Sequence, residues 1–261
     1  MSVLLKRFIS AFILFGVFLF TFFSNNNLFF LILISFVFFI SLFEMNKLLI
    51  LSKKQEFFFW LLPICAFIIH ILNLNNFYFI SFVSSFFWIF IASFSLFQNK
   101  VIFNNLEFSY GLIIIYSLFS SIDYLFHNNS LLLLVTLIFI WVSDIFAYFS
   151  GSFIGKKKLA PLISPGKTIE GVYGAFIANF VLISILSFFL NFSFLKLFFL
   201  IILIIPLSII GDLFESLLKR RLGKKDSGNL IPGHGGILDR VDALCPVLPV
   251  IATMNIQGFF L

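Results

Sequence analysis

The chain has 261 residues, of which 61% are hydrophobic and only 11% are charged, and its formal net charge is +6. A soluble domain is about 45–50% apolar and about 25% charged, so this chain has too few polar side chains to cover a water-soluble globule. The composition excludes a soluble fold and predicts an all-α, polytopic integral membrane helix bundle. Because each span takes about 20 residues, little chain is left for extramembrane domains. We therefore expect any chemistry in short loops and at helix ends.

Apolar runs between polar breaks predict nine transmembrane helices. Several runs have only about 16 residues, which is short for a span, so they need an independent check. The first run follows a basic start, as in a secretory signal, but no small-residue cleavage site comes after it, and we expect a retained first span. The nine runs lie near residues 8–23, 28–43, 57–72, 77–97, 110–126, 131–150, 171–190, 194–211 and 241–260.

The distribution of positive charge provides that check. If the nine helices alternate from a cytoplasmic N-terminus, every basic residue except Lys196 falls on the cytoplasmic side. This is the asymmetry that the positive-inside rule requires. The outer connections 24–27, 73–76 and 127–130 are short and rich in Asn, which predicts tight turns between antiparallel helices.

The residues suited to chemistry gather in the second half of the chain. We predict N-terminal transmembrane helices over residues 1–126 and a C-terminal catalytic region over 127–261, with cytoplasmic loops at 151–170 and 212–240. Five of the eleven acidic residues fall within or just after the second loop. Charge is costly beside a membrane, so acids packed there are functional candidates. These five are Asp212, Glu215, Asp226, Asp239 and Asp242.

Two pairs of acids have helical spacing. Asp212 and Glu215 are three residues apart, as are Asp239 and Asp242, so each pair would share one face of a helix. Two acidic faces that meet could hold magnesium, which takes oxygen ligands and is completed by substrate phosphates and water. The spacing leaves a second interpretation equally open, in which these acids only neutralise neighbouring Lys and Arg side chains.

A basic, glycine-rich segment, residues 219–236, connects the two acid pairs. Glycines let the backbone approach a ligand closely, and Lys and Arg supply positive charge to phosphates. The segment therefore predicts an anion-binding loop, with a flexible loop attracted to anionic lipid headgroups as the alternative. We expect His234, which lies between glycines, to bind phosphate or to orient the loop rather than to bind a metal, because no second His or Cys is near.

The loop 151–170 contains a partial nucleotide-binding pattern. Residues 166–168 look like the end of a P-loop, but that motif needs Gly where the chain has Pro161, which excludes it. Asp144 lies in the preceding apolar span, near its inner end. A buried acid there needs a partner, and a cation or a Lys from the same side is the natural one. Helix packing against a Ser or Asn is the alternative.

The segment from Ser216 to Asp242 resembles the signature of the phosphatidate cytidylyltransferase family, also called CDP-diacylglycerol synthases. It matches that contiguous pattern at every position. Upstream, residues 141–171 are similar to the second conserved block of the family, with Ser152 and Ile169 as mild departures that put a phosphate contact at Ser152 in question. The first 130 residues resemble the family only as hydrophobic spans.

The resemblance implies transfer of the cytidylyl group of CTP to phosphatidic acid, which gives CDP-diacylglycerol and pyrophosphate in phospholipid biosynthesis. It implies a multi-pass protein of the bacterial inner membrane with its active site at the cytoplasmic face. The implied cofactor is Mg²⁺, with a second, monovalent cation left open. The implied partners are CTP, phosphatidic acid, the lipid bilayer and a second copy in a homodimer, and no nucleic acid is expected.

The resemblance also implies roles for individual residues. Asp212 and Asp239 correspond to metal ligands. The implied catalytic residues are Asp144, Lys167, Lys219 and Asp242. The implied phosphate-binding residues are Ser164, Lys167, Thr168, Lys219, Arg220, Lys225, Ser227, His234 and Arg240.

Two rival functions predict different features. A CTP-dependent lipid-alcohol kinase would share acids and basic loops but would lack the contiguous pattern from Ser216 to Asp242. A polytopic transporter or anion channel would show paired broken helices and charges near the middle of the membrane. Here the acids gather at one face instead.

Overall fold

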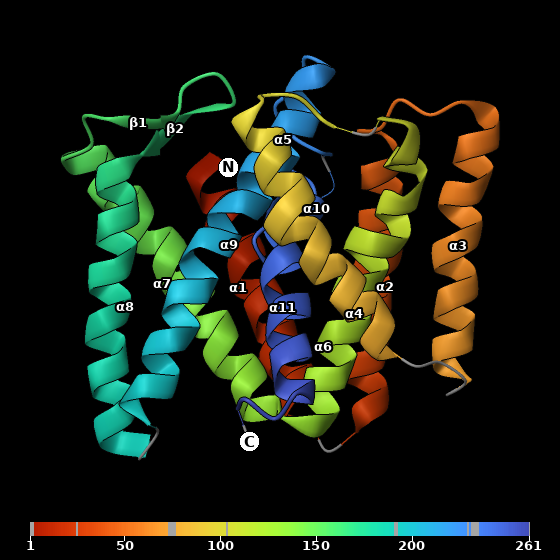
Figure 1. Cartoon of the computed structure of the whole chain (residues 1–261). Helices are drawn as coiled ribbons and strands as arrows, with labels where there is room; N and C mark the ends of the chain where they lie inside the picture. Colours follow the sequence, from red (N-terminus) through yellow and green to blue (C-terminus); the bar gives the residue numbers. More distant parts are fainter. Residues whose placement is uncertain are drawn as a thin grey trace.

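A computed structural model describes residues 3–24, 26–72, 77–102, 104–190, 193–228, 230 and 235–260. These residues form a helix bundle with one small β-hairpin (Figure 1), which confirms the predicted all-α membrane architecture. The elements are α1 (Val3–Phe23), α2 (Asn27–Asn46), α3 (Lys53–Ile71), α4 (Phe77–Phe86), the π-helix η1 (Phe87–Ala92), α5 (Ser93–Phe97), the 3-10 helix η2 (Asn104–Ser109), the π-helix η3 (Gly111–Tyr116), α6 (Ser117–Asn128), α7 (Ser130–Phe153), β1 (Lys158–Ala160), β2 (Ser164–Thr168), α8 (Ile169–Leu190), α9 (Phe194–Arg221), α10 (Leu238–Val241) and α11 (Leu244–Ile256).

The lengths of the helices suit a bilayer. Among the described residues, seven helical segments are long and apolar enough to cross a membrane, from α2 through to α9. Many of the most exposed side chains are large and apolar, including Phe12, Phe97 and Phe188, which is the reverse of a soluble protein. The predicted ninth span, 241–260, contains α11, which has only 13 residues against the usual 20 or so. The count of nine therefore stays a prediction.

Polar side chains in the short connections cap the N-termini of several helices. The side chain of Asn26 accepts a hydrogen bond from the Leu28 amide at the start of α2, and that of Asn129 accepts one from the Leu132 amide at the start of α7. The Thr168 hydroxyl accepts one from the Gly171 amide at the start of α8. Each cap satisfies a helix amide that would otherwise lack a partner. The predicted turn 73–76 lies outside the described residues.

The predicted loops lie at one end of the bundle. Figure 1 shows the β1–β2 hairpin and the segment between α9 and α10 at the same end, whereas the C-terminus lies at the other. The first predicted loop, 151–170, is too long at both ends, because α7 continues to Phe153 and α8 begins at Ile169, and between them lies an antiparallel hairpin in which Lys158 pairs with Thr168. The second predicted loop, 212–240, is wrong at both ends, because α9 continues as a helix to Arg221 and α10 begins at Leu238. Asp212 and Glu215, three residues apart, therefore lie on the same face of α9.

The end of α9 packs closely on the turn between α10 and α11. A Cβ atom added to Gly211 would overlap the Asp242 carbonyl oxygen and would lie 2.8 Å from Cδ of Pro246. Gly211 is therefore needed where it stands, because it lets α9 approach the backbone that carries Asp242. This contact brings the two predicted acid pairs together.

We expect Gly211→Ala to lower the apparent melting temperature of the detergent-solubilised protein by several degrees, because overpacking typically costs about 1–3 kcal/mol. Gly16→Ala is the matched control, since a Cβ at Gly16 meets nothing within 4 Å. Thermal unfolding followed by fluorescence measures both. Equal melting temperatures for the two variants would contradict the close contact.

Candidate active site

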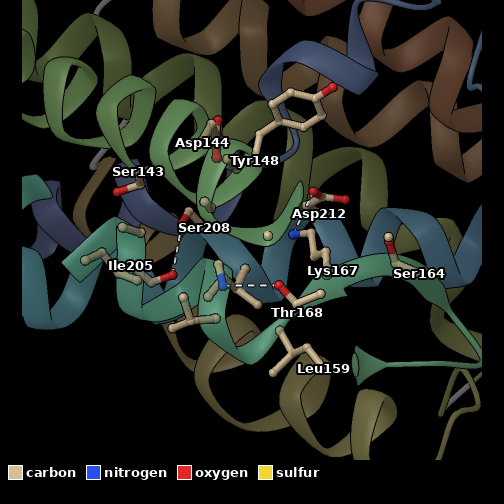
Figure 2. Close-up of a pocket in the computed structure, with 18 of the residues that line it drawn as sticks. Ser143, Asp144, Tyr148, Leu159, Ser164, Lys167, Thr168, Ile205, Ser208 and Asp212 are labelled. Carbon is tan, nitrogen blue, oxygen red and sulfur yellow. Dashed lines mark hydrogen bonds and ion pairs between the residues drawn. The ribbon is translucent and has the colours of Figure 1, made fainter. Parts of the chain in front are cut away.

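A cavity of about 480 Å³ opens among α7, the β1–β2 hairpin, α8, α9 and α10. Its wall includes four aspartates, from α7, α9, α10 and the turn after α10, together with Lys167 and Arg240. Figure 2 shows Asp144 and Tyr148 on one side and Lys167 and Asp212 on another. The four aspartates are Asp144, Asp212, Asp239 and Asp242.

An ion pair joins the hairpin to the long helix. Lys167 Nζ of β2 lies 2.7 Å from Oδ2 of Asp212 in α9, as the dashed line in Figure 2 marks. Both side chains are partly exposed, at 25% and 38%. Such a pair is weak as a source of stability. Its charges are therefore available to a ligand in the cavity.

Lys219 lies where the two acid pairs meet. Its Nζ lies 2.6 Å from Oδ1 of Asp239 and 3.4 Å from Oε2 of Glu215, and all three side chains are nearly buried. The predicted meeting of two acidic faces is therefore present in the structure. Lys219 also neutralises two of these acids, so the alternative of simple charge balance accounts for part of the cluster.

Asp239 is held by an unusually complete set of donors. Besides Lys219, the Gly236 amide donates to its Oδ2 at 2.8 Å, and the amide and hydroxyl of Ser227 donate to the same oxygen at 3.0 Å. Burial by itself raises the pKa of Asp239, but the hydrogen bond from Lys219 and those from the backbone together hold this pKa below its ordinary value. The carboxylate is consequently charged at neutral pH.

Asp144 faces the cavity from the inner part of α7. Its carboxylate interacts electrostatically with Lys167 and Arg240, and with the like charge of Asp212. The predicted partner from the same side of the membrane is thus present as a pair of cations. The alternative of packing against a Ser or Asn applies to its neighbour Ser143, which accepts a hydrogen bond from Asn179 at 2.8 Å.

The structure brings together part of the predicted phosphate-binding set. Ser164, Lys167, Thr168 and Arg240 line the cavity with the four aspartates. Among the described residues of that set, four do not line it, and His234 lies outside the described part of the chain. The four that do not are Lys219, Arg220, Lys225 and Ser227.

Two of these four side chains support the loops instead. Arg220 donates to the carbonyl oxygens of Ile163, at 3.4 Å, and of Lys224, at 3.0 Å, which links the hairpin to the segment after α9. Ser227 is buried and holds Asp239. Sequence spacing cannot separate such supporting roles from direct phosphate contacts, because both use the same residue types.

The structure also adds residues that the sequence did not single out. Ser143 and Tyr148 of α7 and Ser208 of α9 line the cavity, and Ser152, whose role was in question, lines it too. A signal existed for Ser208, which lies one helical turn before Asp212 and so shares its face. No such signal existed for Glu44 of α2, which reaches the same region from the first half of the chain.

The oxygen donors fit a divalent cation only in part. Within the described residues, no three His, Cys, Asp or Glu side chains converge as a metal site. Magnesium, however, commonly uses one or two carboxylates with substrate phosphates and water. Asp212 and Asp239, which line the same cavity, supply that number of carboxylates. The donor set therefore fits a cation held jointly by the protein and a phosphate ligand.

Comparison with known proteins gives a consistent result. The sequence profile described as the cytidylyltransferase family matches residues 5–256. Curated relatives named phosphatidate cytidylyltransferase include those of Staphylococcus haemolyticus (44% identical over 128 residues; 48% of this chain, 49% of the relative), Pseudomonas aeruginosa (43% over 126; 47% and 46%) and Haemophilus influenzae (44% over 129; 47% and 45%). The matched part of the chain thus spans about half the length of these curated relatives.

The hydrogen bonds of Asp239 predict a pH-dependent contribution to stability. At neutral pH, Asp239→Asn should unfold more easily than the parent by on the order of 3 kcal/mol, because it breaks a nearly buried ion pair. Since the pKa of Asp239 is lowered by folding, its contribution is present above the unfolded value of about 3.9 and is lost as the pH falls through the folded value.

The difference between the melting temperatures of parent and variant, measured from neutral pH down to about pH 3, should therefore begin to shrink below about pH 4. A difference that persists unchanged to the lowest pH would contradict this role of the carboxylate.

Proposed function

Because the chain belongs to the cytidylyltransferase family, we propose that it transfers the cytidylyl group of CTP to phosphatidic acid and releases pyrophosphate. The product is CDP-diacylglycerol, a precursor in phospholipid biosynthesis. One observation carries the proposal: four aspartates, Lys167 and Arg240 line a single cavity at the end of a membrane bundle. Such a cavity suits a reaction between a water-soluble triphosphate and a lipid phosphate.

The chemistry needs little acid–base assistance. A phosphate monoester has a second pKa near 6, so the phosphate oxygen of phosphatidic acid is already a nucleophile at neutral pH. That oxygen attacks the α-phosphorus of CTP, a new P–O bond forms, and the bond between the α-phosphorus and the oxygen bridging to the β-phosphate breaks. The electron pair leaves with pyrophosphate. Catalysis then depends on alignment and on charge neutralisation.

The residues of this chain are suited to those two tasks. Lys167 and Arg240 line the cavity and can bind phosphate oxygens, and Ser164 and Thr168 add hydroxyl groups. Asp144 and Asp242 complete the acidic wall. We assign Lys219 to holding Asp239 rather than to direct contact, because it pairs with Asp239 and Glu215 outside the cavity wall.

Magnesium is the cofactor that this assignment implies. Asp212 and Asp239 would hold it, and when bound it would neutralise charge on the triphosphate. Lys167, which is paired with Asp212, would then turn toward phosphate oxygens. A second, monovalent cation and a homodimer belong to the same proposal and rest on the resemblance alone.

The proposed orientation places the cavity at the cytoplasmic face of the bacterial inner membrane. Its support is the distribution of positive charge, because Lys167 lies in β2 and Lys219 in the last turn of α9, and Figure 1 shows these parts at the same end of the bundle. CTP would reach the site from the cytoplasm and phosphatidic acid from the bilayer.

We expect Asp212→Asn to lower turnover at least 100-fold, because it removes a proposed cation ligand, without loss of folding, because its side chain is partly exposed. The assay supplies purified protein in lipid vesicles with labelled CTP, phosphatidic acid and Mg²⁺. Asp226→Asn, an exposed acid of the neighbouring loop, is the matched control and should keep parental activity. An active Asp212→Asn variant would refute the assigned role.

Topology can be tested by cysteine labelling. In a Cys65→Ser background, Lys225→Cys should react with a membrane-impermeant maleimide only in inside-out vesicles, since the other cysteine, Cys245, is buried. Labelling of Lys225→Cys in intact, right-side-out cells would reverse the proposed orientation.

A further inference from the structure

A buried carboxylate from the first half of the chain contacts the segment that carries Asp239. Glu44 lies near the end of α2 and is only 1% exposed. Its Oε2 accepts a hydrogen bond from the Leu238 amide at 2.7 Å and lies 3.1 Å from the Ser227 hydroxyl oxygen, whose single proton serves either Glu44 or Asp239. Leu238 is the first residue of α10 and directly precedes Asp239. Glu44 therefore contacts the backbone of α10 at the residue next to a cavity-lining acid.

Ser227 joins Glu44 to Asp239. Its hydroxyl lies within hydrogen-bond distance of both carboxylates, 3.1 Å from Glu44 and 3.0 Å from Asp239. Its amide also donates to Asp239. A displacement of Glu44 would thus act on Asp239 along two routes, through the Ser227 side chain and through the Leu238 backbone.

The neighbouring glycines leave space for this carboxylate. A Cβ atom at Gly228 would lie 2.5 Å from Oε1 of Glu44, and one at Gly236 would overlap Glu44 and the Ser227 hydroxyl. Gly228, which follows Ser227, and Gly236 therefore both pack directly on the Glu44 carboxylate. Any side chain at these two positions would displace Glu44.

Burial of the Glu44 carboxylate lowers the stability of the folded protein unless hydrogen bonds compensate for it. A buried carboxylate costs free energy unless it is fully hydrogen-bonded. Within the described part of the chain, Oε1 of Glu44 has no hydrogen-bond partner. Its buried neighbours in α2 include the apolar Leu42 and Met45 and only one polar residue close by, Ser41. An acid at this position is explained by what it holds in place rather than by its contribution to packing.

We propose that Glu44 is a positioning residue that fixes α10, and with it Asp239 and Arg240, in the cavity wall. The proposal rests on the proposed function, since it assigns Glu44 to that same site. It means that the N-terminal helices do more than anchor the protein, because α2 completes the support of the cavity.

Steady-state kinetics of the full chain in lipid vesicles test this proposal. Glu44→Ala should raise the KM for CTP or for phosphatidic acid at least fivefold and lower kcat at least tenfold. Glu44→Gln, which keeps the volume and one acceptor oxygen for the Leu238 amide, should recover part of both losses. Glu56→Gln is the matched control, because Glu56 is an exposed acid of α3 and should behave as the parent.

These constants separate positioning from simple destabilisation. A lower folded fraction reduces kcat but leaves both KM values unchanged, so that result, or parental kinetics in Glu44→Ala, would overturn the proposal. If Glu44→Ala does not fold, Glu44→Gln decides by the same criterion, with a KM increase of at least twofold expected.

Hydrogen exchange gives a readout that does not need activity. Loss of Glu44 should speed exchange of the peptide covering 235–241, whereas a peptide covering 130–140 should be unaffected. Unchanged exchange in 235–241 would overturn the proposal. If the parent protein makes no CDP-diacylglycerol, the proposed function is wrong. The hydrogen-exchange experiment then still tests whether Glu44 holds α10.

Discussion

The ion pair of Lys219 with Asp239 joins α9 to α10 at the end of the membrane bundle, and Lys219 also pairs with Glu215 within α9. Charges at this depth are costly unless paired, so one lysine between two acids fixes how the two elements meet. Gly211 permits the approach by leaving room for the Asp242 backbone. The cavity depends on this junction, because Asp212 lies on one side of it and Asp239 and Asp242 lie on the other.

Much of the fold follows from properties that are local in the sequence. The apolar runs and the asymmetry of Lys and Arg predict helices and a common side for the loops, and Asn26 and Asn129 begin helices as expected of N-caps. The end of α9 was harder to place, because its last three turns carry five charged residues, which favoured a loop. They remain helical since Leu213, Phe214, Leu217 and Leu218 are buried in the core.

The candidate site was predicted in its residue types better than in its contacts. Spacing placed Asp212 with Glu215 and Asp239 with Asp242, and the structure brings the two pairs together. Arg220 and Ser227 belong to the same pattern, yet they bind protein carbonyl and carboxylate groups. Glu44 could not have been found, since its partners lie more than 180 residues away and nothing local distinguishes it.

The cavity lies at one end of a largely apolar helix bundle. The hydrophobic excess places the helices in the bilayer, where the proposed lipid substrate is concentrated. Four aspartates, Lys167 and Arg240 line one cavity, which the proposed nucleotide substrate would enter from water. The cavity needs no strong base for the proposed reaction, because the attacking phosphate is ionised at neutral pH. Its aspartates, lysine and arginine suit charge neutralisation and alignment instead.

The fate of the CTP phosphates tests this account most directly. Purified protein in vesicles containing phosphatidic acid and Mg²⁺ would be supplied with CTP labelled at the α-phosphorus or, separately, at the γ-phosphorus. The account predicts that the α-label enters the lipid fraction while the γ-label is released as pyrophosphate. Transfer of the γ-label to lipid would identify a kinase, and it would contradict the account.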